Sequence, residues 1–212
     1  EQTRGGANQD DGFQEMFALV DAAESWGLDV FWLAEMLVNP ARSVLSAPLL
    51  VASWIASRTK RLRVGTAVQL LPLNHPLRVA GEVTTLDHLS QGRFDFGIGR
   101  SGSPRAYDAL GVPYAESQER FFEALEIMLE AWKGEPFTYE GKFYRFVDAA
   151  VAPRPYRRPH PPLRMAATTP ETFPRVARMG LPIFVGLRGM STPELTEHLG
   201  VYRAAWREAG HP

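Results

Sequence analysis

Short apolar runs alternate along the chain with longer segments in which apolar residues recur every three or four positions. The short runs are typical of strands buried on both faces, and the longer segments are typical of amphipathic helices. The predicted strands are residues 30–34, 62–71, 94–99, 163–168 and 182–186, and the predicted helices are residues 13–26, 46–59, 76–90, 115–133, 170–179 and 191–209. Strands that alternate with helices in this way predict parallel βα units and an α/β fold.

Three segments do not follow this alternation. Residues 1–12 are polar and rich in glycine, which predicts a mobile loop. Residues 137–146 predict a small hairpin, and residues 153–162, which contain five prolines, predict an extended connector. We therefore expect a single domain over residues 1–212, with residues 137–162 as an insertion of hairpin and connector.

The glycines at 97, 99 and 102 follow a predicted strand in the pattern of a dinucleotide-binding loop. Such a fold also needs a helix directly after the third glycine and an acidic residue about 20 positions further on. Here Pro104 and a loop intervene, and Glu119 falls inside a predicted helix. The spacing therefore argues against an open sheet that binds a nicotinamide cofactor.

Composition excludes several classes of protein. The net charge is −1 without a long basic run, which argues against a nucleic-acid partner. The absence of cysteine excludes disulfides and thiolate chemistry, and no histidine pair has metal-ligand spacing, so we expect no metal. No apolar run reaches the ~18 residues of a membrane span and no signal peptide is evident, so we expect a cytoplasmic protein without a membrane partner.

Several segments, in order, resemble the bacterial luciferase-like flavin-dependent monooxygenases, a family of TIM-type (β/α)8 barrels. They are residues 31–35, RVGTAVQLLPLNHPLRVA at 63–80, LDHLSQGRFDFGIGR at 86–100, YEGKFYRF at 139–146, and RMAATTPET at 164–172. A complete barrel has eight strands and ~250 residues. We therefore expect a partial barrel that lacks terminal strands, either because the chain is a piece of a longer protein or because it is a shortened member.

The resemblance implies an enzyme that uses reduced FMN and molecular oxygen to oxygenate a small organic substrate. It also implies a separate flavin reductase and a homodimer formed through helices at about 46–58 and 77–90. Two alternatives stay open. Related barrels use a deazaflavin for hydride transfer, and the family contains a shortened flavoprotein, so a flavin-binding protein without turnover is also considered.

Arg100 ends the strand at 94–99, on the face where such barrels hold their active sites. The resemblance makes it a ligand of the flavin phosphate, and the planar guanidinium suits that group. A structural ion pair with Asp108 is the alternative. Tyr107, in the flexible loop expected after Arg100, is a further candidate for lining the pocket.

Thr168 and Thr169 end a strand, and Thr172 lies in the first turn of the next predicted helix. Thr169 is a suitable N-cap, and the free amides of a helix start attract anions. The resemblance implies that these threonines bind the flavin phosphate together with Arg100, although luciferases carry an acidic residue at the position of Thr168. An ordinary N-cap without a ligand is the alternative.

Ala67 and Val68 lie in the strand at 62–71, and the resemblance places them beside the flavin ring. The matching peptide in luciferases is a non-prolyl cis bond, a feature that tends to mark functional sites. The small side chain of Ala67 would leave space for a ring.

Met36 stands where luciferases carry a catalytic histidine. A thioether cannot take up or release a catalytic proton, so the catalytic acid or base stays unknown and light emission is not expected. Glu35 is one candidate for that role. It is either a carboxylate that faces the site or a group engaged in an ion pair or a helix cap.

Overall fold

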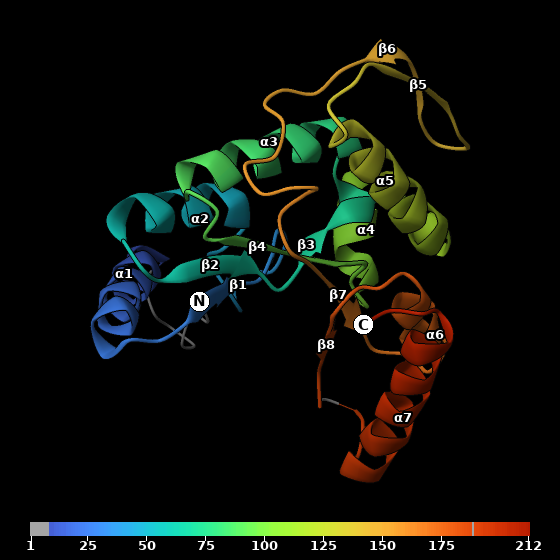
Figure 1. The fold of residues 1–212 in the computed structure, drawn as a ribbon. Helices are drawn as coiled ribbons and strands as arrows, with labels where there is room; N and C mark the ends of the chain where they lie inside the picture. The colour runs from blue at the N-terminus through green and yellow to red at the C-terminus, as the bar shows by residue number, and fades with distance from the viewer. Residues whose placement is uncertain (1–8, 188) are drawn as a thin grey trace. The chain divides into compact units, whose positions relative to one another are not determined.

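The computed structural model describes residues 9–187 and 189–212 (Figure 1). The structure divides into two compact units, one that ends at Pro162 and one that begins at Leu163, and the single domain expected from the sequence stays a prediction. The boundary lies at the end of the proline-rich connector. Within the described ranges, no helix is both long and apolar enough to cross a membrane.

The first unit contains parallel strands with helices between them. Its elements are α1 (Gln9–Trp26), β1 (Val30–Leu33), α2 (Pro48–Arg58), β2 (Arg63–Thr66), β3 (Gln69–Leu70), α3 (Pro76–Leu89), β4 (Phe94–Gly99), α4 (Pro104–Leu110), α5 (Ser117–Ala131), β5 (Phe137–Glu140) and β6 (Arg145–Ala149), with 3-10 turns at Leu71–Leu73 and Tyr114–Glu116. Strand β1 pairs with β2, β2 pairs with β4, and β3 pairs with β4 further along, all in parallel. The predicted α/β class is confirmed.

The core of this unit forms between strand β4 and the helices beside it. All six residues of β4 are buried, as expected for a strand covered on both faces. Helix α3 turns Val79, Val83 and Leu86 inward at helical spacing. Figure 1 shows α2 and α3 side by side along the strands, and residues of the two helices contact each other. These packed layers fix the strand ends that follow.

Two elements differ from the sequence prediction. Helix α1 begins at Gln9, so the last four residues of the expected loop 1–12 are helical, and residues 1–8 lie outside the described residues. The single strand expected at 62–71 is interrupted at the Ala67–Val68 peptide, which is cis, as the resemblance implies. Strand β2 ends before this peptide and β3 begins after it.

The expected hairpin is the antiparallel pair β5–β6, which projects from the helical layer in Figure 1. The Glu123 carboxylate of α5 accepts hydrogen bonds from the backbone amides of Phe143 and Tyr144, each at 3.0 Å. This carboxylate therefore ties the hairpin turn to α5. No helix or strand forms in the proline-rich segment 153–162, as its composition predicts.

The second unit contains β7 (Leu163–Ala167), α6 (Thr172–Arg178), β8 (Ile183–Val185) and α7 (Thr192–Glu208). Strands β7 and β8 pair in parallel, and helices α6 and α7 pack together. Ser191 and Glu194 form a capping box at the start of α7. The expected N-cap of α6 is wrong, because the helix begins at Thr172 and its N-cap is Glu171 instead of Thr169.

Candidate functional site

The carboxyl ends of β3 and β4 meet at one edge of the first unit. Leu70 pairs with Gly99, and Arg100 follows directly. A Cβ at Gly99 would lie 2.4 Å from Val68 Cγ2, so the Val68 side chain packs against bare backbone there. Only glycine permits this approach. Val68 and Arg100, which are both candidate cofactor ligands, therefore lie at the same edge.

The Arg100 side chain is half-buried and keeps most of its hydrogen-bonding capacity. Its Nη1 donates to Ser117 Oγ at 3.0 Å, and the guanidinium carbon lies 5.6 Å from the ring centroid of Tyr114. Among the described residues it forms no salt bridge, with Asp108 or with any other carboxylate. A guanidinium without a carboxylate partner at a strand end is suited to an anionic ligand.

Tyr107 is part of the scaffold and does not lie on a flexible loop. The segment expected as a loop forms helix α4, and Tyr107 is completely buried in it. Its hydroxyl donates to the backbone oxygen of Arg100. Burial, opposed in part by the nearby Arg100 charge, raises the pKa of the phenol to about 12. The neutral hydroxyl thus holds the backbone of Arg100 in place.

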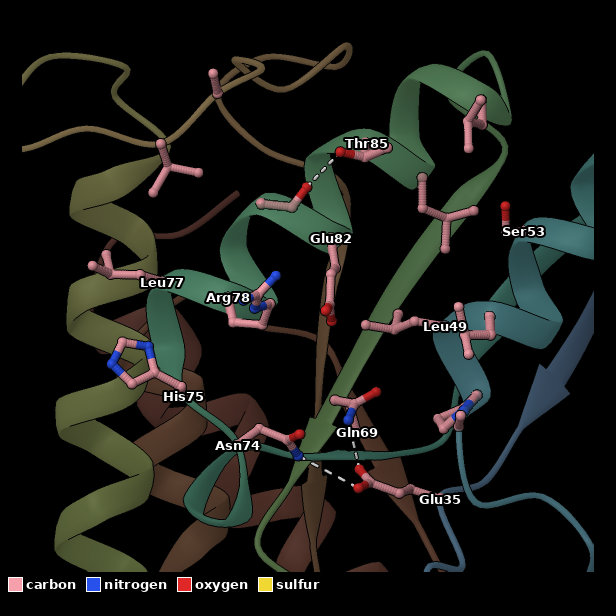
Figure 2. Close-up of a pocket in the computed structure, with 18 of the residues that line it drawn as sticks. Glu35, Leu49, Ser53, Gln69, Asn74, His75, Leu77, Arg78, Glu82 and Thr85 are labelled. Atoms are coloured by element: carbon pink, nitrogen blue, oxygen red, sulfur yellow. Dashed lines mark hydrogen bonds between the residues drawn. The ribbon is translucent and has the colours of Figure 1, made fainter.

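Glu35, two residues beyond β1, is the centre of a buried polar cluster (Figure 2). Its Oε2 accepts from the backbone amide of Leu70 at 2.7 Å and from Gln69 Nε2 at 2.6 Å, and Asn74 Nδ2 lies 3.4 Å from Oε1. Burial raises the pKa of Glu35 to about 7, although hydrogen bonds, first that of the Leu70 amide, lower it in part. In the described part of the chain, no basic group lies within 4 Å of this carboxylate.

The Glu35 cluster lies at one end of a groove of about 1070 Å³. The walls of the groove come from α2 and α3, with Leu49, Ser53, Leu77 and Glu82 among the residues shown in Figure 2. Arg100 and Met36 are not among the described residues that line it. The buried Glu35 carboxyl therefore lies next to the groove between the helices, and its predicted role as a catalytic group stays a prediction.

Sequence reasoning missed Gln69 and Asn74 as members of this cluster. One signal was present, because Gln69 is a lone amide within the apolar run 67–71. A buried amide needs a hydrogen-bond partner, and the nearest strand end offers the Glu35 carboxylate. The spacing of 34 residues between Glu35 and Gln69 hides the pair in the sequence.

The threonines of the second unit are only partly brought together. Thr169 Oγ1 and Thr172 Oγ1 lie 2.9 Å apart, and the Thr172 amide donates to the Thr169 backbone oxygen at 2.9 Å. Thr168 is exposed at the end of β7. Their binding of a phosphate together with Arg100 stays a prediction. Within the described residues, no group of three or more acidic or histidine side chains could hold a metal ion.

Comparison with known proteins identifies both a flavin-dependent monooxygenase and an F420-dependent dehydrogenase among the proteins similar to this chain. The oxygenase component of the flavin-dependent trigonelline monooxygenase of Acinetobacter baylyi is 27% identical over 91% of this chain and 54% of its own length. The F420-dependent glucose-6-phosphate dehydrogenase of Kineococcus radiotolerans is 33% identical over 74% of this chain and 48% of its own length. The chain spans about half the length of the curated relatives it matches.

The fold has a close structural match. The crystal structure of the monooxygenase RslO1 from Streptomyces bottropensis superposes with a TM-score of 0.89 at 31% identity, over 94% of this chain and 61% of that one. The chain thus corresponds to part of a TIM-type barrel, which confirms the expected fold. The family model described as luciferase-like monooxygenase matches residues 1–212, and the chain belongs to this family.

Proposed function

We propose that this protein is a flavin-dependent monooxygenase that uses reduced FMN and molecular oxygen to oxygenate a small organic substrate. Its family membership and its similarity to the oxygenase component of a flavin-dependent monooxygenase support this assignment. The observation that carries the proposal is Arg100 at the end of β4, whose guanidinium has a hydroxyl partner but no carboxylate partner among the described residues. This arrangement fits the phosphate of FMN.

The residues at the strand ends fit a flavin in separate ways. Arg100 would bind the phosphate, and Thr168, Thr169 and Thr172 would add hydroxyl and amide donors. The half-buried pair Ala67–Val68 would contact the ring, as the resemblance implies, and the Val68 side chain is held at this edge by its packing on Gly99. Reduced FMN supplies the electrons that activate oxygen, and the protein residues orient the cofactor and exclude water.

Met36 limits the chemistry that the protein itself can add. It occupies the position after Glu35 at the β1 end, and its thioether cannot exchange a proton. A reaction that needs a histidine base at this position, such as aldehyde oxidation with light emission, is therefore not proposed. The catalytic acid or base is left unassigned.

Hydride transfer with a deazaflavin is the second candidate. The similarity to a dehydrogenase that uses F420, a deazaflavin, favours it. A deazaflavin also carries a phosphate, so Arg100 serves both proposals equally. The substrate of either reaction is left open, because the residues described here contain no cluster of like charges that would select an acidic or basic compound.

Cofactor binding followed by exposure to oxygen separates these candidates. The protein is mixed anaerobically with FMN reduced by dithionite, which stands in for the proposed separate reductase, and air is then added. Binding of reduced FMN, with reoxidation kinetics different from those of free FMN, supports the monooxygenase. Binding of a deazaflavin but not of FMN overturns it in favour of hydride transfer, and FMN binding with unchanged reoxidation favours a flavin-binding protein without turnover.

The proposed enzyme acts as a homodimer formed through α2 and α3. Leu50 and Leu89 line the groove between these helices with 74% and 59% of their surface exposed, which is unusual for large apolar side chains. Light scattering should give twice the monomer mass for the native protein and the monomer mass for Leu50→Glu. Leu28→Glu, at a leucine outside this groove with 50% exposure, is the matched control and should stay dimeric. A monomeric native protein would overturn the dimer.

A further inference from the structure

We propose that Glu35 is a positioning residue, whose carboxyl holds β3 from the groove side and thereby sets the place of Val68 and Arg100 at the cofactor-binding edge. The meaning of this role rests on the proposed function, since FMN is the ligand that this edge would bind.

Glu35 contacts three successive residues around β3. Its Oε2 accepts from the Gln69 side chain and from the Leu70 amide at 2.6 Å and 2.7 Å, and its own amide donates to the Val68 oxygen at 3.4 Å. Strand β3 is only two residues long. A strand this short has few ladder bonds of its own, so the Glu35 carboxyl supplies a large share of the bonds that hold it.

Strand β3 in turn touches the residues at the end of β4. Leu70 pairs with Gly99, and the Val68 side chain packs on Gly99 where no Cβ could fit. Arg100 follows Gly99 without an intervening residue. Packed backbone transmits small shifts because interiors leave little empty space. A displacement of β3 would therefore move Val68 against Gly99 and change the direction of Arg100.

The ionisation of Glu35 changes with pH near neutrality, because burial raises its pKa and none of the charged groups described around it pairs with its carboxylate. His75, Arg78 and Glu82 line the same groove from the α3 side, and Tyr107 of α4 lies near enough for the Glu35 charge to help raise the pKa of its phenol. None of these groups forms a salt bridge with Glu35. Burial raises the pKa of Glu35 to about 7. The ionised carboxylate accepts stronger hydrogen bonds than the neutral acid, so its hold on β3 should tighten between pH 6 and pH 8.

Glu24 offers a control, because its carboxylate also accepts hydrogen bonds from amides next to a strand but lies away from β3. Its carboxylate accepts from the backbone amides of Lys60, Arg61 and Leu62 at 3.0, 3.0 and 2.7 Å, at the opposite end of β2. A purely structural carboxylate of this kind should affect stability without affecting the cofactor edge. Comparison of the two glutamates therefore separates positioning from general stabilisation.

The first measurement is amide hydrogen exchange at single-residue resolution without any ligand. In Glu35→Ala, the exchange rates of Leu70 and Arg100 should rise about tenfold, because a buried hydrogen bond to a charged group is lost. In Glu24→Ala, the rise should be confined to residues 60–62. Unchanged protection of Leu70 in Glu35→Ala would overturn the proposal. If Glu35→Ala does not fold, Glu35→Leu, which keeps a side chain of similar size but accepts no hydrogen bond, carries the same measurement.

The second measurement is the Kd of oxidised FMN at pH 6 and pH 8, from flavin fluorescence. Glu35→Ala should bind FMN about tenfold more weakly than the native protein, and Glu24→Ala should bind it equally well. Glu35→Gln should show a smaller pH dependence of the Kd than the native protein. Equal losses in the two alanine variants would overturn the positioning role. If the native protein binds neither FMN nor a deazaflavin, the proposed function fails, while the exchange rate of Leu70 still decides whether Glu35 holds β3.

Discussion

The two ends of the parallel strands in the first unit use charged residues in different ways. At the amino end, the buried Asp95 accepts from Arg63 at 2.9 and 2.5 Å and lies 3.4 Å from Arg157. The Asp87 carboxylate nearby accepts from the Arg157 amide at 2.8 Å. These contacts join β2, β4, α3 and the proline-rich connector through opposite charges.

At the carboxyl end, the corresponding charges are not paired with one another. Among the described residues, Glu35 has amide donors but no cation, and Arg100 has a hydroxyl but no carboxylate. Neutralised charge stabilises a fold, whereas charge held in place without a counter-ion is available to a ligand. The contrast supports the proposal that the amino end of these strands serves stability and the carboxyl end serves binding, the division found in TIM-type barrels generally.

The largest expected effect tests the amino end. Asp95→Ala should lower the free energy of unfolding by about 3 to 5 kcal/mol, because Arg63 and Arg157 lose a buried partner. Urea denaturation measures this change. Asp21→Ala removes the carboxylate from an exposed pair with Arg58 and should have a far smaller effect, because solvent screens this pair. Equal costs for the two variants would remove the basis for treating the amino end as a stabilising network.

The next effect is the pH dependence of stability at Glu35. The folded-state pKa of about 7 lies above the ordinary value of 4.5, so the unfolded chain releases this proton first as the pH rises. We therefore compare the free energy of unfolding of the native protein with that of Glu35→Gln. The difference should favour the native protein most below pH 4.5 and should shift against it by roughly 3 kcal/mol by pH 8.

Urea denaturation of both proteins at pH 5, 6, 7 and 8 measures this difference. Subtracting the Gln variant removes the contribution of the histidines and other carboxylates that the two proteins share. A difference that stays constant across this range would show that Glu35 is ionised with an ordinary pKa, and the contrast with the paired amino end would weaken.

A smaller effect is expected for FMN affinity at Arg100. Arg100→Ala should weaken FMN binding by about thirtyfold, roughly 2 kcal/mol, through loss of charge-assisted bonds to the phosphate. The unfolding free energy should change little, since Arg100 has no carboxylate partner to leave behind. Arg105→Ala, at an exposed arginine of α4, is the control and should bind FMN normally. Equal affinity of Arg100→Ala and the native protein would remove Arg100 from the binding end.

The smallest effect concerns the threonines of the second unit. Thr169→Val should weaken FMN binding by about fivefold, roughly 1 kcal/mol, because one neutral hydrogen bond is lost. Titration followed by flavin fluorescence measures this loss, and equal affinity of Thr169→Val and the native protein would remove Thr169 from the proposed phosphate ligands.

Several local features follow from the sequence alone. The order and type of the main elements are those predicted, because apolar periodicity, prolines at helix starts and glycines at helix ends act over a few residues. Pro76 begins α3 and Gly92, with φ of 78°, follows its end. The placement of Arg100 at the end of a buried strand was predictable for the same reason.

Only the tertiary structure decided what lies beside each strand end. Local sequence preference does not encode three of the observed features: the interruption of the strand at residues 67–68, the burial of Tyr107 and the N-cap at Glu171. These features depend on neighbours that are distant in sequence or on backbone geometry. Glu35 could be read from the sequence as a catalytic group, an ion pair or a cap. Its contact with β3 arises because parallel pairing brings together residues about 35 positions apart, and burial then requires each polar group to find a partner there.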